Sequence, residues 1–321
     1  MEYRQLGKSG LRVSAIGMGG NPFGRDVDEA QAARIINHAI DLGVNFFDTA
    51  DVYVQGVSER FVGKAVASRR QQVLIATKVA KTRGSMGDAV NNRGASRKHI
   101  MDGVEASLRR LGADYIDLYQ LHEVDATTPI EETLRALDDL VHAGKVRYLG
   151  CSNFAAWQIV EALWTADRRN LTSFVSSQSR YNALQRPIER ELLPACRHFG
   201  VGIIAFSPLN MGILTGKYRP DEPVPADSRA ARNPQLDGLR RQLNPEQLAR
   251  VSAFAKLARE YARTPSQLAL AWLLAQPGVS TVIAGSTKAE HLDDNVQAAD
   301  WKLAADDLRR VDEALGFGDA K

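Results

Sequence analysis

The chain has 321 residues, two cysteines and a formal charge of +3 at pH 7. This charge is close to balanced and no basic run is interleaved with aromatics, which argues against nucleic-acid binding. Two cysteines are too few for a disulfide framework and fit a reducing compartment. The start has no signal-peptide core and no stretch approaches the roughly 18 apolar residues of a membrane span, so we expect a cytoplasmic protein with no membrane partner.

Short apolar runs recur along the whole chain and predict buried strands. They lie at residues 13–17, 44–48, 73–78, 116–122, 146–150, 174–178, 201–206 and 281–285. Two further runs, at residues 3–6 and 11–13, flank the turn GKSG. We expect these two to form a hairpin that precedes the main series and covers the floor of the fold.

Helical patterns with readable ends lie between the strands. Asp28 is followed three residues later by Gln31, and Thr264 is followed by Pro265 and Gln267; both patterns are typical of a helix start. Gly43 and Gly112 follow apolar stripes and predict helix ends. Thr128, Pro129 and Glu131 predict a third capping box, in front of the stripe Leu134, Leu137, Leu140 and Val141.

Eight strands that each lead into a helix predict a parallel sheet with crossover connections. An open doubly wound sheet and a closed (β/α)8 TIM barrel are both possible. Eight units in about 300 residues without an internal linker favour the barrel, with residues 1–321 forming one domain. Residues 208–245, after the seventh strand, are rich in Gly, Pro and Arg and too long for an ordinary connection, which predicts a lid or binding loop.

Four polar residues stand at or just beyond the carboxyl ends of three predicted strands: Asp48, Tyr53, Lys78 and His122. In a parallel barrel these ends face one mouth, so we expect the four side chains to converge there. Tyrosine is an available acid at pH 7, and a nearby ammonium stabilises the phenolate left after it gives up its proton. A carboxylate balances the ammonium, and an imidazole adds a second polar group toward a carbonyl oxygen.

This group contains no strong nucleophile and no metal cage, so another component must deliver the reducing equivalent, and nicotinamide hydride is the obvious candidate. Polar groups after later strands suit such a cofactor. Ser152, Asn153 and Gln178 could bind a carboxamide. Phe206 and Ser207 end the seventh strand, and the aromatic ring of Phe206 could stack on a flat ring. Gly285, Ser286 and Lys288 precede a predicted helix and form a reasonable phosphate seat.

The segments FFDTADVYVQGVSE, IATK, LYQLHEVD, VRYLGCSNF, IAFSPLNMGILTGKY and IAGSTKAEHLDDN closely resemble the aldo-keto reductase family, in order and over nearly the whole chain. The resemblance implies a (β/α)8 barrel that reduces aldehydes and ketones with NADPH. It implies that Asp48, Tyr53, Lys78 and His122 are the catalytic tetrad, with Tyr53 as general acid. The cofactor contacts that it implies are Ser152, Asn153, Gln178, Phe206, Ser207, Leu209, Gly212, Gly285, Ser286, Lys288, His291, Asp294 and Asn295.

His291 stands where many members of that family carry an arginine on the adenosine 2′-phosphate. Histidine is mostly neutral at pH 7 and lacks the bidentate grip of arginine, although Lys288 could supply a charge. We therefore expect NADPH to be preferred, with NADH as a weaker alternative.

Each tetrad residue taken alone has an ordinary structural explanation, and only their joint positions favour catalysis. Two other functions stay open. One is an NADPH-binding regulatory subunit with little turnover, like the potassium-channel β subunits that share this fold. The other is a metal-dependent barrel hydrolase, although the six histidines show no ligand spacing. The pattern names no particular aldehyde, ketone or sugar and leaves monomer and homo-oligomer both possible.

Overall fold

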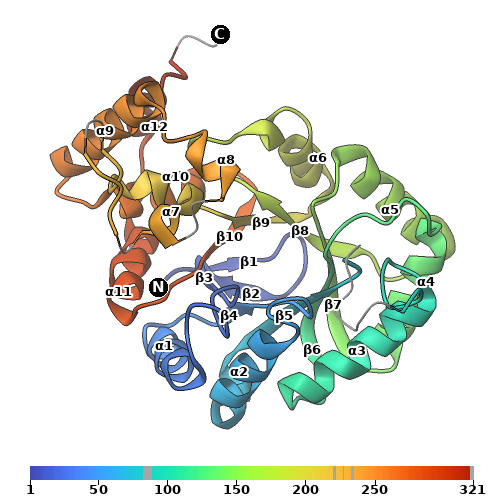
Figure 1. The fold of residues 1–321 in the computed structure, drawn as a ribbon. Coiled ribbons are helices and arrows are strands. Elements are labelled where there is room, and N and C mark those ends of the chain that lie inside the picture. Colours follow the sequence, from blue (N-terminus) through green and yellow to red (C-terminus); the bar gives the residue numbers. More distant parts are fainter. Residues whose placement is uncertain (82–88, 220–221, 227, 233–234, 319–321) are drawn as a thin grey trace.

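The computed structural model describes residues 1–81, 89–219, 222–226, 228–232 and 235–318. Within them, parallel strands close into a barrel in the order β10-β3-β4-β5-β6-β7-β8-β9 (Figure 1). The strands are β3 (Ile16–Gly19), β4 (Phe46–Asp48), β5 (Leu74–Val79), β6 (Ile116–Leu121), β7 (Val146–Ser152), β8 (Phe174–Arg180), β9 (Gly202–Phe206) and β10 (Val279–Ala284). The predicted (β/α)8 TIM barrel is therefore confirmed.

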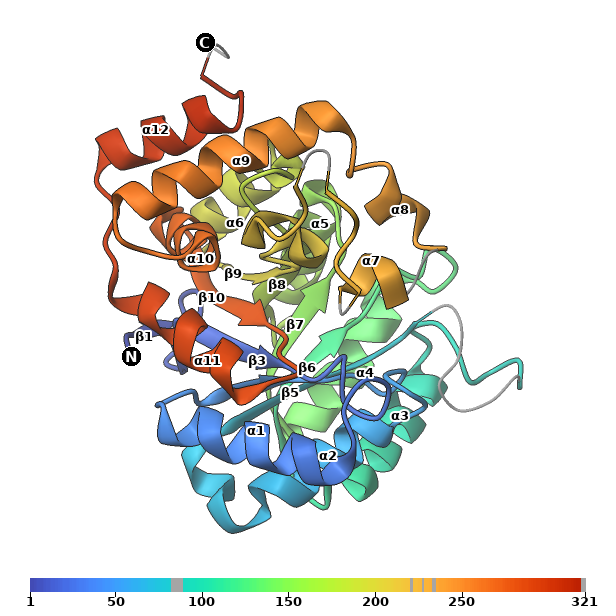
Figure 2. The same cartoon turned by 60° about the vertical axis from the view of Figure 1, so that its left-hand side comes forward.

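Helices surround this barrel on the outside, as the two views show (Figures 1 and 2). The longer ones are α1 (Glu29–Asp41), α2 (Val57–Val66), α3 (Arg97–Leu111), α4 (Ile130–His142), α5 (Ala156–Arg169), α6 (Leu192–Phe199), α9 (Pro245–Glu260), α10 (Pro265–Ala275), α11 (Ala289–Val296) and α12 (Ala305–Ala314). Short helical turns are η1 (Ala67–Gln72), η2 (Pro187–Glu189), η3 (Asn210–Thr215), α7 (Arg229–Arg232), α8 (Asp237–Arg240) and η4 (Gln297–Asp300).

Two of the predicted helix starts are confirmed and one is wrong. The Asp28 side chain accepts a hydrogen bond from the Gln31 backbone N–H, and Thr264 forms a full capping box at the start of α10. Thr128 does not cap α4, which begins after Pro129. Its hydroxyl instead donates to Asp125 Oδ2 at 2.7 Å. This local hydrogen bond holds the Thr128 side chain in an arrangement other than the cap.

The predicted hairpin is present at the amino-terminal end of the barrel. β1 (Tyr3–Gln5) pairs antiparallel with β2 (Arg12–Ser14), and Leu6 and Val13 pack in one apolar cluster with strand residues from the barrel interior. The predicted strand at residues 13–17 is wrong in its bounds, because the chain bends at Ala15 and β3 begins at Ile16. The Ser14 hydroxyl donates to the Ile16 carbonyl at 2.7 Å, a local bond that stabilises this bend.

The connection at residues 208–245 contains more structure than a simple loop. It includes η3, α7 and α8, and Ile213, Tyr218 and Leu239 pack with residues of α9 in an apolar cluster. Burial, with Arg25 nearby, lowers the pKa of Arg229, which places α7 beside the loop that follows β3. Residues 220, 221, 227, 233 and 234 of this predicted lid lie outside the described residues. The segment thus leads from β9 past the neighbouring strand β10 toward the loop that follows β3.

Candidate functional site

Three strands and one loop bring the four predicted catalytic side chains to the same end of the barrel. Asp48 is the last residue of β4, Lys78 lies near the end of β5, and His122 directly follows β6. Tyr53 lies in the connection from β4 to α2. Because all the barrel strands are parallel, their carboxyl ends share one mouth, and the side chains meet there.

Lys78 is the centre of the group and is fully buried, with 0% of its surface exposed. Its Nζ donates to Asp48 Oδ2 at 2.6 Å, to the Thr49 carbonyl at 2.8 Å and to Tyr53 Oη at 3.3 Å. Burial alone would lower the pKa of Lys78, but Asp48 and Tyr53 outweigh it and raise that pKa. The ammonium therefore keeps its charge inside the barrel.

The second oxygen of Asp48 is held by two amides. Gln178 Nε2 donates to Asp48 Oδ1 at 2.7 Å, and Gln120 Nε2 donates to the same atom at 3.2 Å. Sequence reasoning assigned Gln178 to the cofactor alone and missed Gln120 altogether. The alternation of strand side chains was the available signal, since Gln120 lies two residues before His122 on the same face.

Tyr53 supplies the phenol that faces Lys78. Burial raises the pKa of Tyr53, and the Lys78 ammonium opposes this rise. The hydroxyl therefore keeps its proton at pH 7 and is available as an acid. The ring lies with its centroid 5.0 Å from Lys78 Nζ. The next three residues, Val54, Gln55 and Gly56, all have positive φ, so the backbone turns sharply before α2.

His122 packs edge to face on Tyr53, with ring centroids 5.9 Å apart. Burial, with Lys78 and Lys81 nearby, lowers the pKa of His122 to about 2. The imidazole is therefore neutral, and its role is that of a hydrogen-bonding group. Its Nδ1 is buried without a hydrogen-bond partner among the described residues. An unpartnered buried polar atom at a barrel mouth fits a site that a ligand completes.

Asn153 and Ser152 adjoin this group after β7. Asn153 is exposed, has φ of 60°, and its amide donates to the His122 carbonyl and to Ser152 Oγ, both at 3.0 Å. Ser152 is buried. The structure thus places both residues beside His122, with Gln178 behind them on Asp48.

The predicted stacking residue Phe206 ends β9 and is half-buried. The guanidinium of Arg180 lies over its ring at 5.4 Å. Ser207 and Leu209 follow, and Ser207 has φ of 59°. Gly212 has φ of 93°, and a Cβ there would lie 2.9 Å from Lys217 Cε. Glycine at this position therefore permits both the turn and the close approach of Lys217.

The remaining predicted residues follow β10. Gly285 and Lys288 are exposed, Ser286 and Asn295 are buried, and the Ser286 hydroxyl donates to the Lys288 carbonyl at 2.6 Å. Asp294 accepts from Thr264 Oγ1 at 2.9 Å and from Gln267 Nε2 at 2.9 Å. Asp294 is therefore tied to the cap of α10.

His291 stands in a cationic cluster with Lys288 and Lys217. Burial and then these two lysines lower the pKa of His291, so both ammonium groups lie close to its ring. Sequence reasoning missed Lys217, which follows Gly216 in LTGKY, far along the chain from Lys288. Glu290 and Asp294 act on His291 in the opposite sense, so basic and acidic side chains adjoin here. The two exposed lysines are the groups at this place that suit an anion. Among the described residues, no group of three or more His, Cys, Asp or Glu side chains could hold a metal ion.

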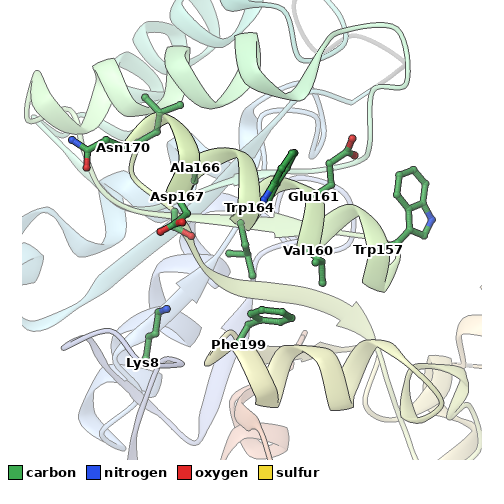
Figure 3. A pocket seen from close by; sticks show the side chains of 12 residues that line it. Lys8, Trp157, Val160, Glu161, Trp164, Ala166, Asp167, Asn170 and Phe199 are labelled. Carbon is green, nitrogen blue, oxygen red and sulfur yellow. The ribbon is translucent and has the colours of Figure 1, made fainter.

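A large groove lies elsewhere on the molecule, along α5 and α6. It has a volume of about 820 Å³, and Figure 3 shows Trp157 and Trp164 from α5 and Phe199 from α6 among its lining residues. None of the predicted site residues lines it. Among the described residues, no helix is long and apolar enough to cross a membrane.

Comparisons with known proteins agree with the barrel fold. A model of the aldo/keto reductase family matches residues 15–315. A probable voltage-gated potassium channel subunit beta from Arabidopsis thaliana is 40% identical over 94% of this chain and 92% of its own length. A putative voltage-gated potassium channel subunit beta from Schizosaccharomyces pombe is 41% identical over 98% of this chain and 93% of its own length. The uncharacterized oxidoreductase YrpG of Bacillus subtilis is 38% identical over 98% of this chain and 95% of its own length.

Proposed function

Since this chain belongs to the aldo/keto reductase family of oxidoreductases, we propose that it reduces the carbonyl group of a small aldehyde, ketone or sugar with NADPH. The observation that carries the proposal is the hydrogen-bond chain from buried Asp48 through buried Lys78 to half-buried Tyr53, with bonds of 2.6 and 3.3 Å. It ends in a neutral phenol beside a permanent positive charge, which is the arrangement that proton donation to an oxygen requires.

The residues at the mouth fit a nicotinamide cofactor. Phe206 presents an aromatic ring, Asn153 an exposed amide, and Lys217, Lys288 and His291 an anion-binding surface. These residues would hold the ring, its carboxamide and the phosphates respectively. When bound, the cofactor supplies the hydride for the carbonyl carbon.

Tyr53 would donate its proton to the carbonyl oxygen as negative charge develops on that oxygen. Lys78 stabilises the phenolate that remains, and the Asp48 carboxylate keeps Lys78 charged. His122 is neutral, so it would orient and polarise the carbonyl by a hydrogen bond and would not protonate it. The proton is thus moved by one residue and the charge is stabilised by the others.

The test is replacement of Tyr53 by Phe, which keeps the ring and removes only the acidic hydroxyl. We expect turnover, followed as loss of NADPH absorbance with a panel of aldehydes, ketones and sugars, to fall by about 10²–10⁴-fold. NADPH affinity should stay nearly unchanged. Full turnover in the Tyr53→Phe variant would refute the proposal.

A regulatory role is a second candidate, because two of the similar proteins are named as potassium channel β subunits. Such a protein would bind NADPH tightly and turn over slowly or not at all. Tight NADPH binding by calorimetry, together with no turnover on any carbonyl of the panel, would favour this function over the first.

A further inference from the structure

A buried carboxylate lies behind the tetrad, on the outer face of the barrel. Glu59, in the first turn of α2, has 0% of its surface exposed. Both of its oxygens are engaged: Thr77 Oγ1 donates to Oε1 at 2.6 Å, and Arg110 Nε donates to Oε2 at 2.5 Å. A charge buried this completely is costly unless it is paired and hydrogen-bonded, and Glu59 is both.

These partners join the elements that carry the two central groups of the site. Thr77 directly precedes Lys78 on β5, and strand alternation points the two side chains to opposite faces. Arg110 belongs to α3, the helix beside α2. Glu59 itself lies in the first turn of the helix that follows the Tyr53 loop. One carboxylate therefore connects the strand of Lys78 with the element that ends the loop of Tyr53.

The loop of Tyr53 needs such an anchor because its backbone is strained. Val54 has φ of 49° and Gln55 has φ of 53°, a region that side chains other than glycine adopt at a cost. Gly56 follows with φ of 84°, and the Arg110 side chain packs so closely over it that a Cβ there would overlap the guanidinium. The Tyr53 carbonyl accepts from the backbone N–H groups of Gly56 and Ser58, so the loop moves with the start of α2.

We propose that Glu59 is a positioning residue: by binding Thr77 and Arg110 it fixes the Tyr53 hydroxyl against the Lys78 ammonium. This inference rests on the proposed function, in which Tyr53 is the general acid. Glu59 touches none of the four tetrad side chains through a hydrogen bond and acts only through the backbone of β5 and α2.

The geometry has a consequence for the pH dependence of turnover. Burial raises the pKa of Tyr53, Lys78 opposes this rise, and the Asp48 and Asp51 carboxylates add to it. Greater separation of Tyr53 from Lys78 therefore raises that pKa further. Proton donation is lost as pH rises through the pKa of the acid. Loosening the Glu59 contacts should therefore lower the plateau of kcat and move its alkaline limb to higher pH.

The first variants are Glu59→Gln, which removes the charge, and Thr77→Val, which removes one hydrogen bond with little change of shape. We expect kcat per folded molecule to fall about tenfold in each, with the alkaline limb shifted upward and NADPH affinity within about twofold of the parent. Thr77→Ser keeps the hydroxyl, so its kcat and the pH of its alkaline limb should both match those of the parent protein.

Asp117→Asn is the matched control. Asp117 is also a buried carboxylate bound to an arginine, with Arg70 Nη2 at 2.7 Å, but it lies at the start of β6, near the other end of the barrel. The Asp117→Asn variant should lose thermal stability as Glu59→Gln does, but the alkaline limb of its kcat–pH profile should stay at the parental pH. Equal pH profiles in Glu59→Gln, Thr77→Val and Asp117→Asn would overturn the inference.

A readout without turnover separates this inference from the proposed function. The pKa of Tyr53 is obtained from ultraviolet absorbance of tyrosinate, as the difference between a protein and its Tyr53→Phe counterpart. The inference requires this pKa to be higher in the Glu59→Gln background, and an unchanged pKa contradicts it even if no substrate is found. Normal turnover of the Tyr53→Phe variant refutes the proposed function, and the positioning role with it. If Tyr53→Phe loses turnover but the Glu59 variants keep the parental turnover and pH profile, only the inference about Glu59 is refuted.

Discussion

The two sides of the barrel mouth differ in how far their charged side chains are buried and paired. Lys78 and Asp48 are buried and paired with each other, and Asp48 receives further hydrogen bonds from Gln120 and Gln178. On the other side, Lys288, Lys217 and His291 are exposed, and Glu290 and Asp294 also lie near His291. The first region is paired within the protein except at His122 Nδ1, whereas the second presents its basic side chains to solvent.

This difference matches what each region would be asked to do. Groups that stabilise developing charge work best when they are fixed before the reaction, because no energy is then spent on reorganisation. Groups that bind and release a charged cofactor need to remain accessible. Substitutions around Lys78 should therefore change the stability of the protein, whereas substitutions around Lys288 should change its affinity for the ligand.

The largest effect is expected from Lys78→Met, which leaves Asp48 buried without its counter-ion. We expect turnover to fall by about 10³-fold or more, and the free energy of unfolding to fall by about 3–5 kcal/mol. Urea unfolding and NADPH-linked turnover measure the two quantities. A variant with parental stability would show that the pair is not the buried, mutually dependent unit that the 2.6 Å contact indicates.

The next effect concerns pH and His122, whose pKa in the folded protein is about 2. The unfolded chain, with an ordinary histidine pKa of about 6.5, binds this proton more strongly, so stability is retained above pH 6.5 and falls as pH decreases toward 2. Between pH 6.5 and 4.5 the loss attributable to His122 is about 2–3 kcal/mol. It is measured as the difference in unfolding free energy against His122→Asn, and parallel pH curves for the two proteins would contradict it.

On the exposed side, Lys288→Met should weaken NADPH binding about tenfold and leave the free energy of unfolding within about 0.5 kcal/mol of the parent. The loss should shrink at high salt, because exposed charges are screened. Titration calorimetry at two ionic strengths measures this. A Lys288 variant that loses stability but keeps its affinity would reverse the contrast between the two regions.

The smallest effect is expected from His291→Arg. Arginine keeps its charge at pH 7 and offers a bidentate grip, so the preference for NADPH over NADH should rise by about three- to tenfold. The ratio of kcat/KM for the two cofactors measures it. If the parent protein already discriminates very strongly between them, His291 does not limit selectivity.

Much of the fold could be predicted because its signals are local. The apolar runs located all eight barrel strands, and the Asp28 and Thr264 caps located two helices. The prediction failed at Thr128, where a carboxylate three residues earlier captures the hydroxyl, and at Ala15, where a side-chain bond ends a strand early. Both failures come from short polar side chains that have more than one partner within reach.

The sequence by itself determined the barrel, its floor hairpin and the residues that meet at its mouth, because strand periodicity and parallel topology place strand ends together. Only the tertiary structure decided which polar groups pair. Gln120 and Gln178 hold Asp48, Glu59 joins β5 to α3, and Lys217 joins the cluster at α11. These contacts link residues far apart in the chain, and barrel closure and register set their distances, which no local pattern encodes.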